Sequence, residues 1–202
     1  MGTIKTTNIE PIATNGTVTL GSSGDTFTVP SGVTVNMSSA TQTGVGGVNT
    51  PAFKARLSSD QTIANGTDTT IACNTEKFDT AGCYNNTGST VTLNGISTPA
   101  YSFAPNVAGK YFVYGGARFT STSGSGTLAY VLLQKNGTNS FLGISDFVPY
   151  VGQNVGGIVE MNGSSDTLKL TVYQNSGGSK TIVGASSDND DLANFGAFKI
   201  IE

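Results

Sequence analysis

The sequence contains no histidine. This absence removes the side chain that most often acts as a general base, and with it every Ser-His or Cys-His nucleophile pair. The two cysteines, Cys73 and Cys83, have no further cysteine or histidine with which to complete a zinc site. They are too few for a disulfide scaffold, and whether they are bridged to each other stays open. We therefore expect a protein that is not an enzyme.

Charge is also scarce, since charged residues make up 11% of the 202 residues and the net charge is −3. Without clustered Lys and Arg, the chain lacks the electrostatic surface that nucleic acid or an anionic membrane requires. No run approaches about 18 apolar residues, so no inserted helix is expected. Residues 1–17 contain no apolar core of a secretory signal, and we expect no export signal.

What the chain does contain is glycine, at 27 residues, together with abundant Ser, Thr and Asn. Apolar residues alternate with polar ones in short runs, which is the two-residue period of strands with one buried face. Asn-Gly, the dipeptide most typical of tight hairpins, begins at residues 15, 65, 94, 136 and 162. The pattern predicts strands at 52–57, 70–73, 90–93, 101–103, 111–119, 128–135, 156–161, 168–173 and 194–201. Asn65-Gly66 lies between the first two of these, as a hairpin turn would.

The densest apolar block is residues 100–119, AYSFAPNVAGKYFVYGGARF. It contains the run 111–114, which follows Gly109 and ends before Gly115. An aromatic and β-branched run between such breakers predicts a buried strand rather than a helix. We expect this strand to be central to the core.

Residues 1–49 are poorer in apolar side chains and predict a small β-rich unit. Short alternating pieces around Leu20, Phe27 and Val33 are separated by the turn sequences GSSGD and PSG. One copy offers too little apolar surface for its own core, so the segment either folds against residues 50–202 or wraps around other copies of itself. We favour the second alternative, with the glycine-rich residues 41–49 as a linker.

Three segments of residues 51–202 together resemble the C1q/TNF-like jelly-roll domain. They are AFKARL at 52–57, the central series formed by KFD at 77–79, YN at 84–85, YSF at 101–103 and VAGKYF at 107–112, and NFGAFKII at 194–201. Residues 89–100 form an insertion relative to that pattern, and Ala108 stands where the family has proline. The resemblance implies an all-β, jelly-roll β-sandwich head at 50–202, preceded by the small β-rich N-terminal segment.

The resemblance also implies a homotrimer whose subunits meet through flat aromatic faces near the axis. The candidate interface residues are Tyr111, Tyr114, Phe195 and Phe198, for each of which a purely internal role stays open. Some C1q-like heads carry calcium, and the oxygen-rich residues Asp188, Asp190 and Asp191 are the candidate ligands here. Adjacent acids in a loop are more often simply solvated, and no other cofactor is implied.

The opening IKTTNIE, the Gly- and Thr-rich segment after it and the C1q-like head resemble short virion proteins of tailed bacteriophages. This predicts a non-enzymatic trimeric virion protein, a short surface fibre for host attachment, joined to other virion proteins through residues 1–49. Its head would contact a host glycan or protein through the predicted loops 138–155 and 177–191. The alternatives are a capsid decoration or head-fibre protein, or a soluble C1q-like lectin. A polysaccharide-cleaving enzyme using two of Asp146, Glu160 and Asp166 is the least favoured reading.

Overall fold

A computed structural model of the chain describes residues 19–35, 49–120, 128–145, 152–185 and 192–200. The chain divides into two units, Met1–Val45 and Gly46–Glu202. Every regular element in the described ranges is a β-strand. No helix among these residues is long and apolar enough to cross a membrane.

The described part of the first unit, residues 19–35, consists of turns and extended chain. The two predicted turns are present, one closed by Asp25 N–H donating to Ser22 O at 3.0 Å and one by Val33 N–H donating to Pro30 O at 3.2 Å. The strands predicted beside them are not formed within residues 19–35 of a single chain, where no second strand lies alongside. Large apolar side chains such as Phe27, 71% exposed, are left open to solvent.

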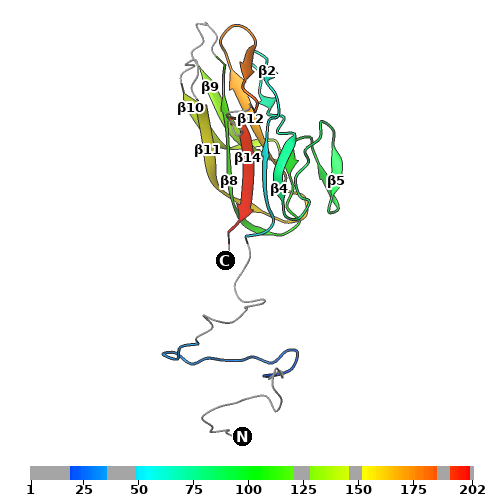
Figure 1. Cartoon of the computed structure of the whole chain (residues 1–202), viewed down its shortest axis with the longest axis vertical. Helices are drawn as coiled ribbons and strands as arrows, with labels where there is room; N and C mark the ends of the chain where they lie inside the picture. The colour runs from blue at the N-terminus through cyan, green and yellow to red at the C-terminus, as the bar shows by residue number, and fades with distance from the viewer. Residues whose placement is uncertain (1–18, 36–48, 121–127, 146–151, 186–191, 201–202) are drawn as a thin grey trace, which may run out of the picture. The chain divides into compact units, whose positions relative to one another are not determined.

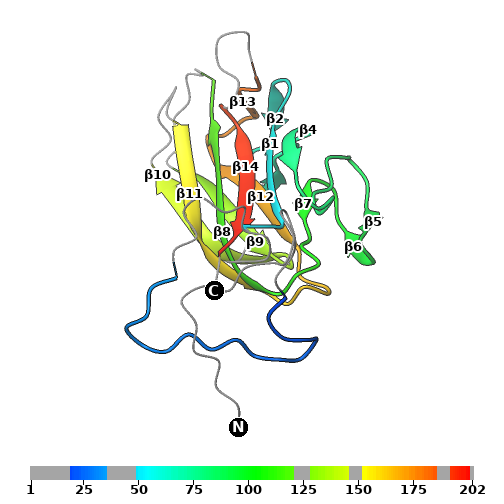
Figure 2. The ribbon, with the colours of Figure 1, turned by 60° about the horizontal axis from the view of Figure 1, so that its bottom comes forward.

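The second unit is built on a five-stranded antiparallel sheet, which we call the first sheet (Figures 1 and 2). Its strands in spatial order are β11 (Gly152–Met161), β8 (Gly109–Arg118), β14 (Asn194–Lys199), β1 (Ala52–Arg56) and β4 (Thr75–Asp79). The opening strand β1 therefore pairs directly with the closing strand β14, as the resemblance predicted, with Ala52 opposite Phe198.

A second antiparallel sheet faces the first. Its strands in spatial order are β10 (Thr138–Ser145), β9 (Ala129–Lys135), β12 (Leu168–Gln174) and β3 (Thr69–Thr70), and β7 (Ser102–Phe103) also pairs with β12. Two small ladders join β2 (Gln61–Ile63) to β13 (Lys180–Ile182) and β5 (Val91–Leu93) to β6 (Ile96–Thr98). Between β8 and β14 the chain passes repeatedly from one sheet to the other, as in a double-sheet jelly roll.

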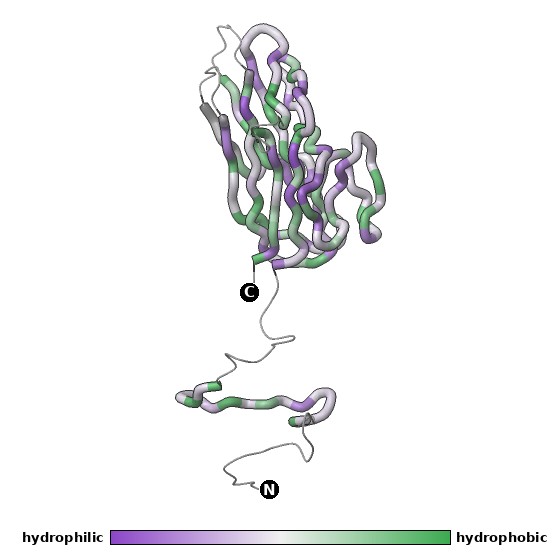
Figure 3. Tube along the Cα trace, viewed as in Figure 1, coloured by the Kyte–Doolittle hydropathy of each residue, from purple (hydrophilic) through white to green (hydrophobic). Residues whose placement is uncertain are grey.

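An aromatic cluster centred on Phe53 fills the space between the sheets. Its ring stacks on Tyr84 and Phe103 at centroid distances of 4.5 and 4.6 Å, and Phe195 meets it edge-on at 5.0 Å. The buried Tyr84 hydroxyl donates to Cys73 O at 2.8 Å, which satisfies its polar end. Figure 3 shows the strands mixing apolar and polar residues along their length, as sheets with one buried face require.

The Asn-Gly turns have mixed outcomes. Asn94-Gly95 closes the β5–β6 hairpin and Asn136-Gly137 closes the β9–β10 hairpin, with positive φ at both residues of each turn. Asn65-Gly66 forms a turn, but the predicted hairpin between 52–57 and 70–73 is wrong. The strands on its two sides belong to different ladders, since β2 pairs with β13 and β3 with β12.

The two predicted surface loops are also partly wrong. Residues 138–145 are strand β10 and residues 152–155 begin β11, while 146–151 lie outside the described residues. The second loop contains β13, which pairs with β2. Both segments carry polar and glycine residues within their strands. Their composition therefore resembles that of loops and did not predict the strand pairing.

Candidate functional site: the outer aromatic face

Strand β8 presents aromatic side chains to both sides of the first sheet. Tyr111 and Val113 point inward and are fully buried, whereas Phe112 points outward and is 37% exposed. Tyr114, also on the outward side, is half-buried. The block that the sequence predicted to be uniformly buried is thus divided between core and surface by the alternation of the strand.

The outward aromatic residues gather with neighbours from the flanking strands. Cross-strand pairing sets Phe112 between Ile158 on β11 and Phe198 on β14. The Phe112 and Phe198 ring centroids lie 5.6 Å apart, and those of Phe112 and Tyr114 lie 6.2 Å apart. Ile158 is 55% exposed. We define the outer aromatic face as these four residues: Phe112, Tyr114, Ile158 and Phe198.

Glycine 196 allows this face to lie flat. It is the cross-strand partner of Tyr114 on β14, and a Cβ atom added to it would stand 2.5 Å from the far end of the Tyr114 ring. On the other side of Tyr114 the partner is Gly156. The ring therefore lies over backbone, and any side chain at Gly196 would move it away.

Polar residues border the outer aromatic face at both ends of the strands. Lys110 and Glu160 are cross-strand partners at one end, and both are exposed. At the other end Asn194 and Asn154 flank Gly116 on its two sides. A small aromatic centre with a polar border is the composition of protein interfaces rather than of a random surface.

Two of the four candidate interface residues are buried inside the single chain, which is the internal role that the sequence left open. Tyr111 and Phe195 are 0% and 1% exposed within the single chain, because both belong to the inward parity of their strands. The Tyr111 hydroxyl donates to Val107 O at 2.7 Å, and burial raises the pKa of this phenol. Tyr114 and Phe198 lie on the outer aromatic face, as a subunit contact requires.

Sequence reasoning missed Phe112 and Ile158. Neither could be assigned to a side, because strand parity reverses if the first inward residue is shifted by one. A usable signal was the set of glycines at 116, 156 and 196, which face outward on three adjacent strands. Such glycines beside a tyrosine indicate a flat surface.

Of the acidic candidates, Glu160 and Asp166 line one pocket of about 310 Å³ together with Lys135. Asp188, Asp190, Asp191 and Asp146 lie outside the described residues. Asp166 pairs with Lys135, its Oδ2 accepting from Nζ at 2.8 Å. Burial opposes its charge, but hydrogen bonds from Lys135, Asn136 and the Asn162 N–H outweigh burial and lower the pKa of Asp166. No group of three or more metal-ligating side chains occurs in the part of the chain that is described.

The cysteines are both free and buried. Burial raises the pKa of Cys73 to about 12, and it raises the pKa of Cys83 as well. Both thiols are packed into the core cluster between the sheets. A bridge between them is therefore not formed.

Neither a protein-family model nor a curated protein sequence matches the chain. Solved structures do match it. The crystal structure of murine APRIL at pH 8.0 aligns with a TM-score of 0.51 at 11% identity, covering 74% of this chain and 98% of that one. The second unit is a C1q/TNF-like jelly roll. A second structure of murine APRIL, at pH 8.5, has a TM-score of 0.47 at 11% identity and covers 74% of this chain and 99% of that one.

Within this C1q/TNF-like jelly roll, the insertion predicted at residues 89–100 is the β5–β6 hairpin. It stands to one side of the two sheets in both views of the ribbon (Figures 1 and 2). Its two strands pair only with each other among the described strands. The hairpin thus adds surface to the jelly roll without altering its sheets.

Proposed function

We propose that this protein is a non-enzymatic, homotrimeric structural protein of a tailed-bacteriophage particle. In this proposal it is a short surface fibre, with the first unit attached to other virion proteins and the jelly roll in contact with the host surface. The observation that carries the assembly part is the outer aromatic face.

The outer aromatic face supports self-association because it is apolar, flat and partly exposed in the single chain. Phe112, Phe198 and Ile158 are 37%, 36% and 55% exposed, although each stands beside another apolar side chain. A contiguous aromatic patch on a monomer usually marks a contact surface. A three-fold arrangement would let each copy cover this face with a neighbour, which the resemblance to C1q/TNF-like heads favours.

The first unit supports the same proposal. Leu20, Phe27, Val33 and Val35 are each more than half exposed within residues 19–35 of a single chain. Extended segments of this kind bury their apolar side chains when other copies supply the missing strands. The virion location rests on a resemblance to phage virion proteins. That resemblance lies in the opening residues, the Gly- and Thr-rich segment after them and the C1q-like head.

Mass measurement tests the assembly. Light scattering coupled to size exclusion, run at micromolar concentration on the full chain, is expected to give three times the 20.6 kDa of one chain. A species of single-chain mass at that concentration would contradict the trimer. Removing residues 1–45 separates the contributions of the two units, since the jelly roll alone retains the outer aromatic face.

Location in the particle tests the role. Gold-labelled antibodies against the jelly roll, viewed by electron microscopy of intact particles, are expected to label a tail appendage. Label distributed over the capsid would favour the alternative, a decoration or head-fibre protein. Absence of label from every purified particle would contradict a virion protein of either kind.

A further inference from the structure

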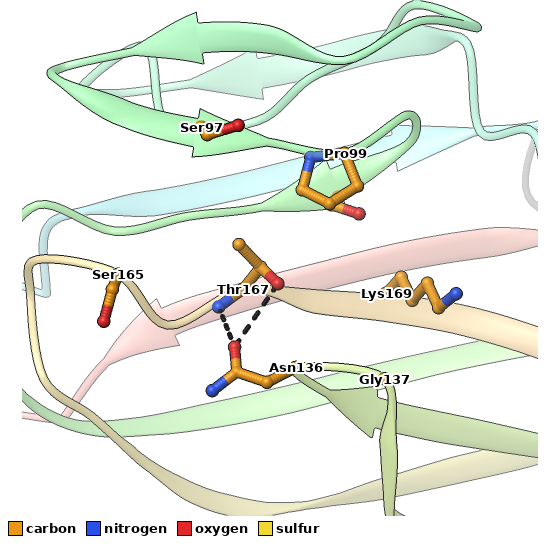
Figure 4. A pocket seen from close by; sticks show the side chains of 8 residues that line it. Ser97, Pro99, Asn136, Gly137, Ser165, Thr167 and Lys169 are labelled. Atoms are coloured by element: carbon orange, nitrogen blue, oxygen red, sulfur yellow. Dashed lines mark hydrogen bonds between the residues drawn. The ribbon is translucent and has the colours of Figure 1, made fainter.

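A polar pocket of about 400 Å³ lies between the β5–β6 hairpin and the second sheet. We call it the hairpin pocket. Figure 4 shows Ser97 and Pro99 on the hairpin side, with Asn136, Thr167 and Lys169 on the opposite side. Its volume falls within the range of about 300–1,000 Å³ typical of small-molecule sites. The lining residues that matter here are Ser97, Pro99, Ser102, Asn136, Thr167 and Lys169.

The hairpin wall of this pocket is fixed at its base and its tip. At the base, the side-chain amide of Asn85, 2% exposed, donates to Ser89 O, Thr98 O and Pro99 O at 2.8, 3.0 and 2.8 Å. At the tip, Asn94 Nδ2 donates to Ala81 O and Gly82 O, both at 3.0 Å. Side-chain hydrogen bonds thus hold an inserted element against the rest of the jelly roll.

The opposite wall is equally ordered. Asn136 Oδ1 accepts from the Thr167 N–H at 2.8 Å, and Asn136 Nδ2 donates to Asp166 Oδ1 at 2.7 Å. Asp166 is neutralised by its salt bridge with Lys135. The wall therefore offers amide and hydroxyl groups in fixed positions, and the carboxylate of Asp166 behind it does not line the pocket and is already paired.

Lys169 is the cation of the hairpin pocket. It is half-buried, and its ammonium group makes no hydrogen bond or ion pair with the described residues. Its cross-strand partners, Gln134 and Ser102, are neutral. A partly desolvated ammonium without a counter-charge attracts an anionic ligand group. The Ser97 hydroxyl on the facing wall also has no hydrogen-bond partner among the described residues, so it is available to a ligand.

We propose that the hairpin pocket binds a carboxylated sugar. The carboxylate pairs with Lys169, the sugar hydroxyls exchange hydrogen bonds with Ser97, Thr167 and Asn136, and the apolar face of the sugar ring lies against Pro99. This inference deepens the proposed attachment function and rests on it for the biological source of the sugar. The pocket itself lies within one chain, so its binding does not depend on assembly.

The lining chemistry selects this class over other anions. A phosphate group usually requires several cations or converging backbone N–H groups, whereas the hairpin pocket has one cation, Lys169. An apolar peptide side chain requires an apolar pocket, and Pro99 supplies the one apolar ring in the lining. One charge among four hydroxyl groups and one side-chain amide matches a ligand with one carboxylate per ring and several hydroxyls.

Titration calorimetry on the full chain tests the proposal with two acidic probes and their neutral counterparts. The probes are tetragalacturonate beside its methyl ester, and 3′-sialyllactose beside lactose. We expect at least one acid to bind at least tenfold more tightly than its neutral counterpart. Lys169→Gln should weaken that binding at least tenfold, and Lys169→Arg should restore most of it. Lys77→Gln on β4, the same charge change on the first sheet, should leave it unchanged.

Three results would overturn the hairpin pocket as an acidic-sugar site. They are no binding of either acid at 10 mM, equal binding of acid and neutral counterpart, or unchanged binding by a folded Lys169→Gln variant. The mass of the same sample separates this inference from the proposed assembly. A single-chain species that binds an acidic sugar would support the hairpin pocket and contradict the trimer. A trimer that binds neither acidic sugar would support the assembly and contradict the hairpin pocket.

Discussion

The two faces of the first sheet carry similar residues and have different surroundings. Tyr111 and Phe195 on the inner face are buried against Phe53 and its neighbours. Phe112 and Phe198 on the outer face differ from them in position by one and three residues, and more than a third of each side chain is exposed. Aromatic content therefore does not distinguish a folding residue from a contact residue in this sheet, whereas strand parity does.

The largest expected effect comes from breaking the inner face. Tyr111→Ala removes a fully buried ring and should lower the free energy of unfolding by roughly 3–5 kcal/mol. Its outer neighbour provides the matched control, since Phe112→Ala should cost about 1 kcal/mol or less in the single chain. Urea denaturation at several protein concentrations separates chain stability from association. Equal losses for the two variants would remove the distinction between the faces.

The next effect concerns association. Phe112→Glu places a charge at the centre of the outer aromatic face and should weaken self-association by at least about 2 kcal/mol, roughly thirtyfold in the dissociation constant. Sedimentation measures it. Tyr173→Glu is the control, because Tyr173 is a half-buried aromatic residue in the second sheet that stacks on Tyr130. A Phe112→Glu protein that remains fully assembled would exclude this face as the contact.

A smaller effect tests whether self-association requires the outer aromatic face to be flat. Gly196→Ala forces the far end of the Tyr114 ring away from the sheet, because the new Cβ would lie 2.5 Å from it. We expect self-association to weaken by about 1 kcal/mol, because the raised ring spoils the fit of the contact. Chain stability should change little, because the end of the ring that moves is on the outer face of the sheet. Loss of folding instead of association would show that Gly196 serves the core and not the outer face.

The smallest effect is a reaction that should not occur. Because the pKa of Cys73 is raised to about 12, its thiol is almost entirely protonated and unreactive at pH 8. A disulfide reagent should modify it no faster than the chain unfolds. Tyr111→Ala, but not Phe112→Ala, should accelerate the reaction. Rapid modification of Cys73 in the folded protein would show that the inner face is open.

Much of the fold followed from residue patterns. Alternation located most strands, the resemblance of 52–57 and 194–201 to paired family strands gave the β1–β14 ladder, and Asn94-Gly95 and Asn136-Gly137 marked true hairpins. The sequence patterns did not predict which strands pair when the partners are far apart in the chain. Asn65-Gly66 has the sequence of a hairpin turn, but the choice of partners β13 and β12 depends on residues more than 100 positions away.

The sequence predicted two of the four residues of the outer aromatic face, Tyr114 and Phe198. The resemblance indicated aromatic residues of β8 and β14, but a run such as 111–114 contains both parities and does not state which one faces inward. The hairpin pocket was not predictable. In the sequence, Lys169 has the pattern of an ordinary outward residue of an alternating strand. The inserted hairpin lies opposite it only in the folded chain.

The position of β14 between β8 and β1 also affects how the protein is made. The strand that joins the two halves of the first sheet follows all the other described strands in chain order, so it is synthesised after them. A product terminated before Asn194 would keep the pairs β11–β8 and β1–β4, each with an uncovered edge at the missing strand. Truncated products should therefore aggregate or be degraded, so that cells accumulate chains synthesised through β14.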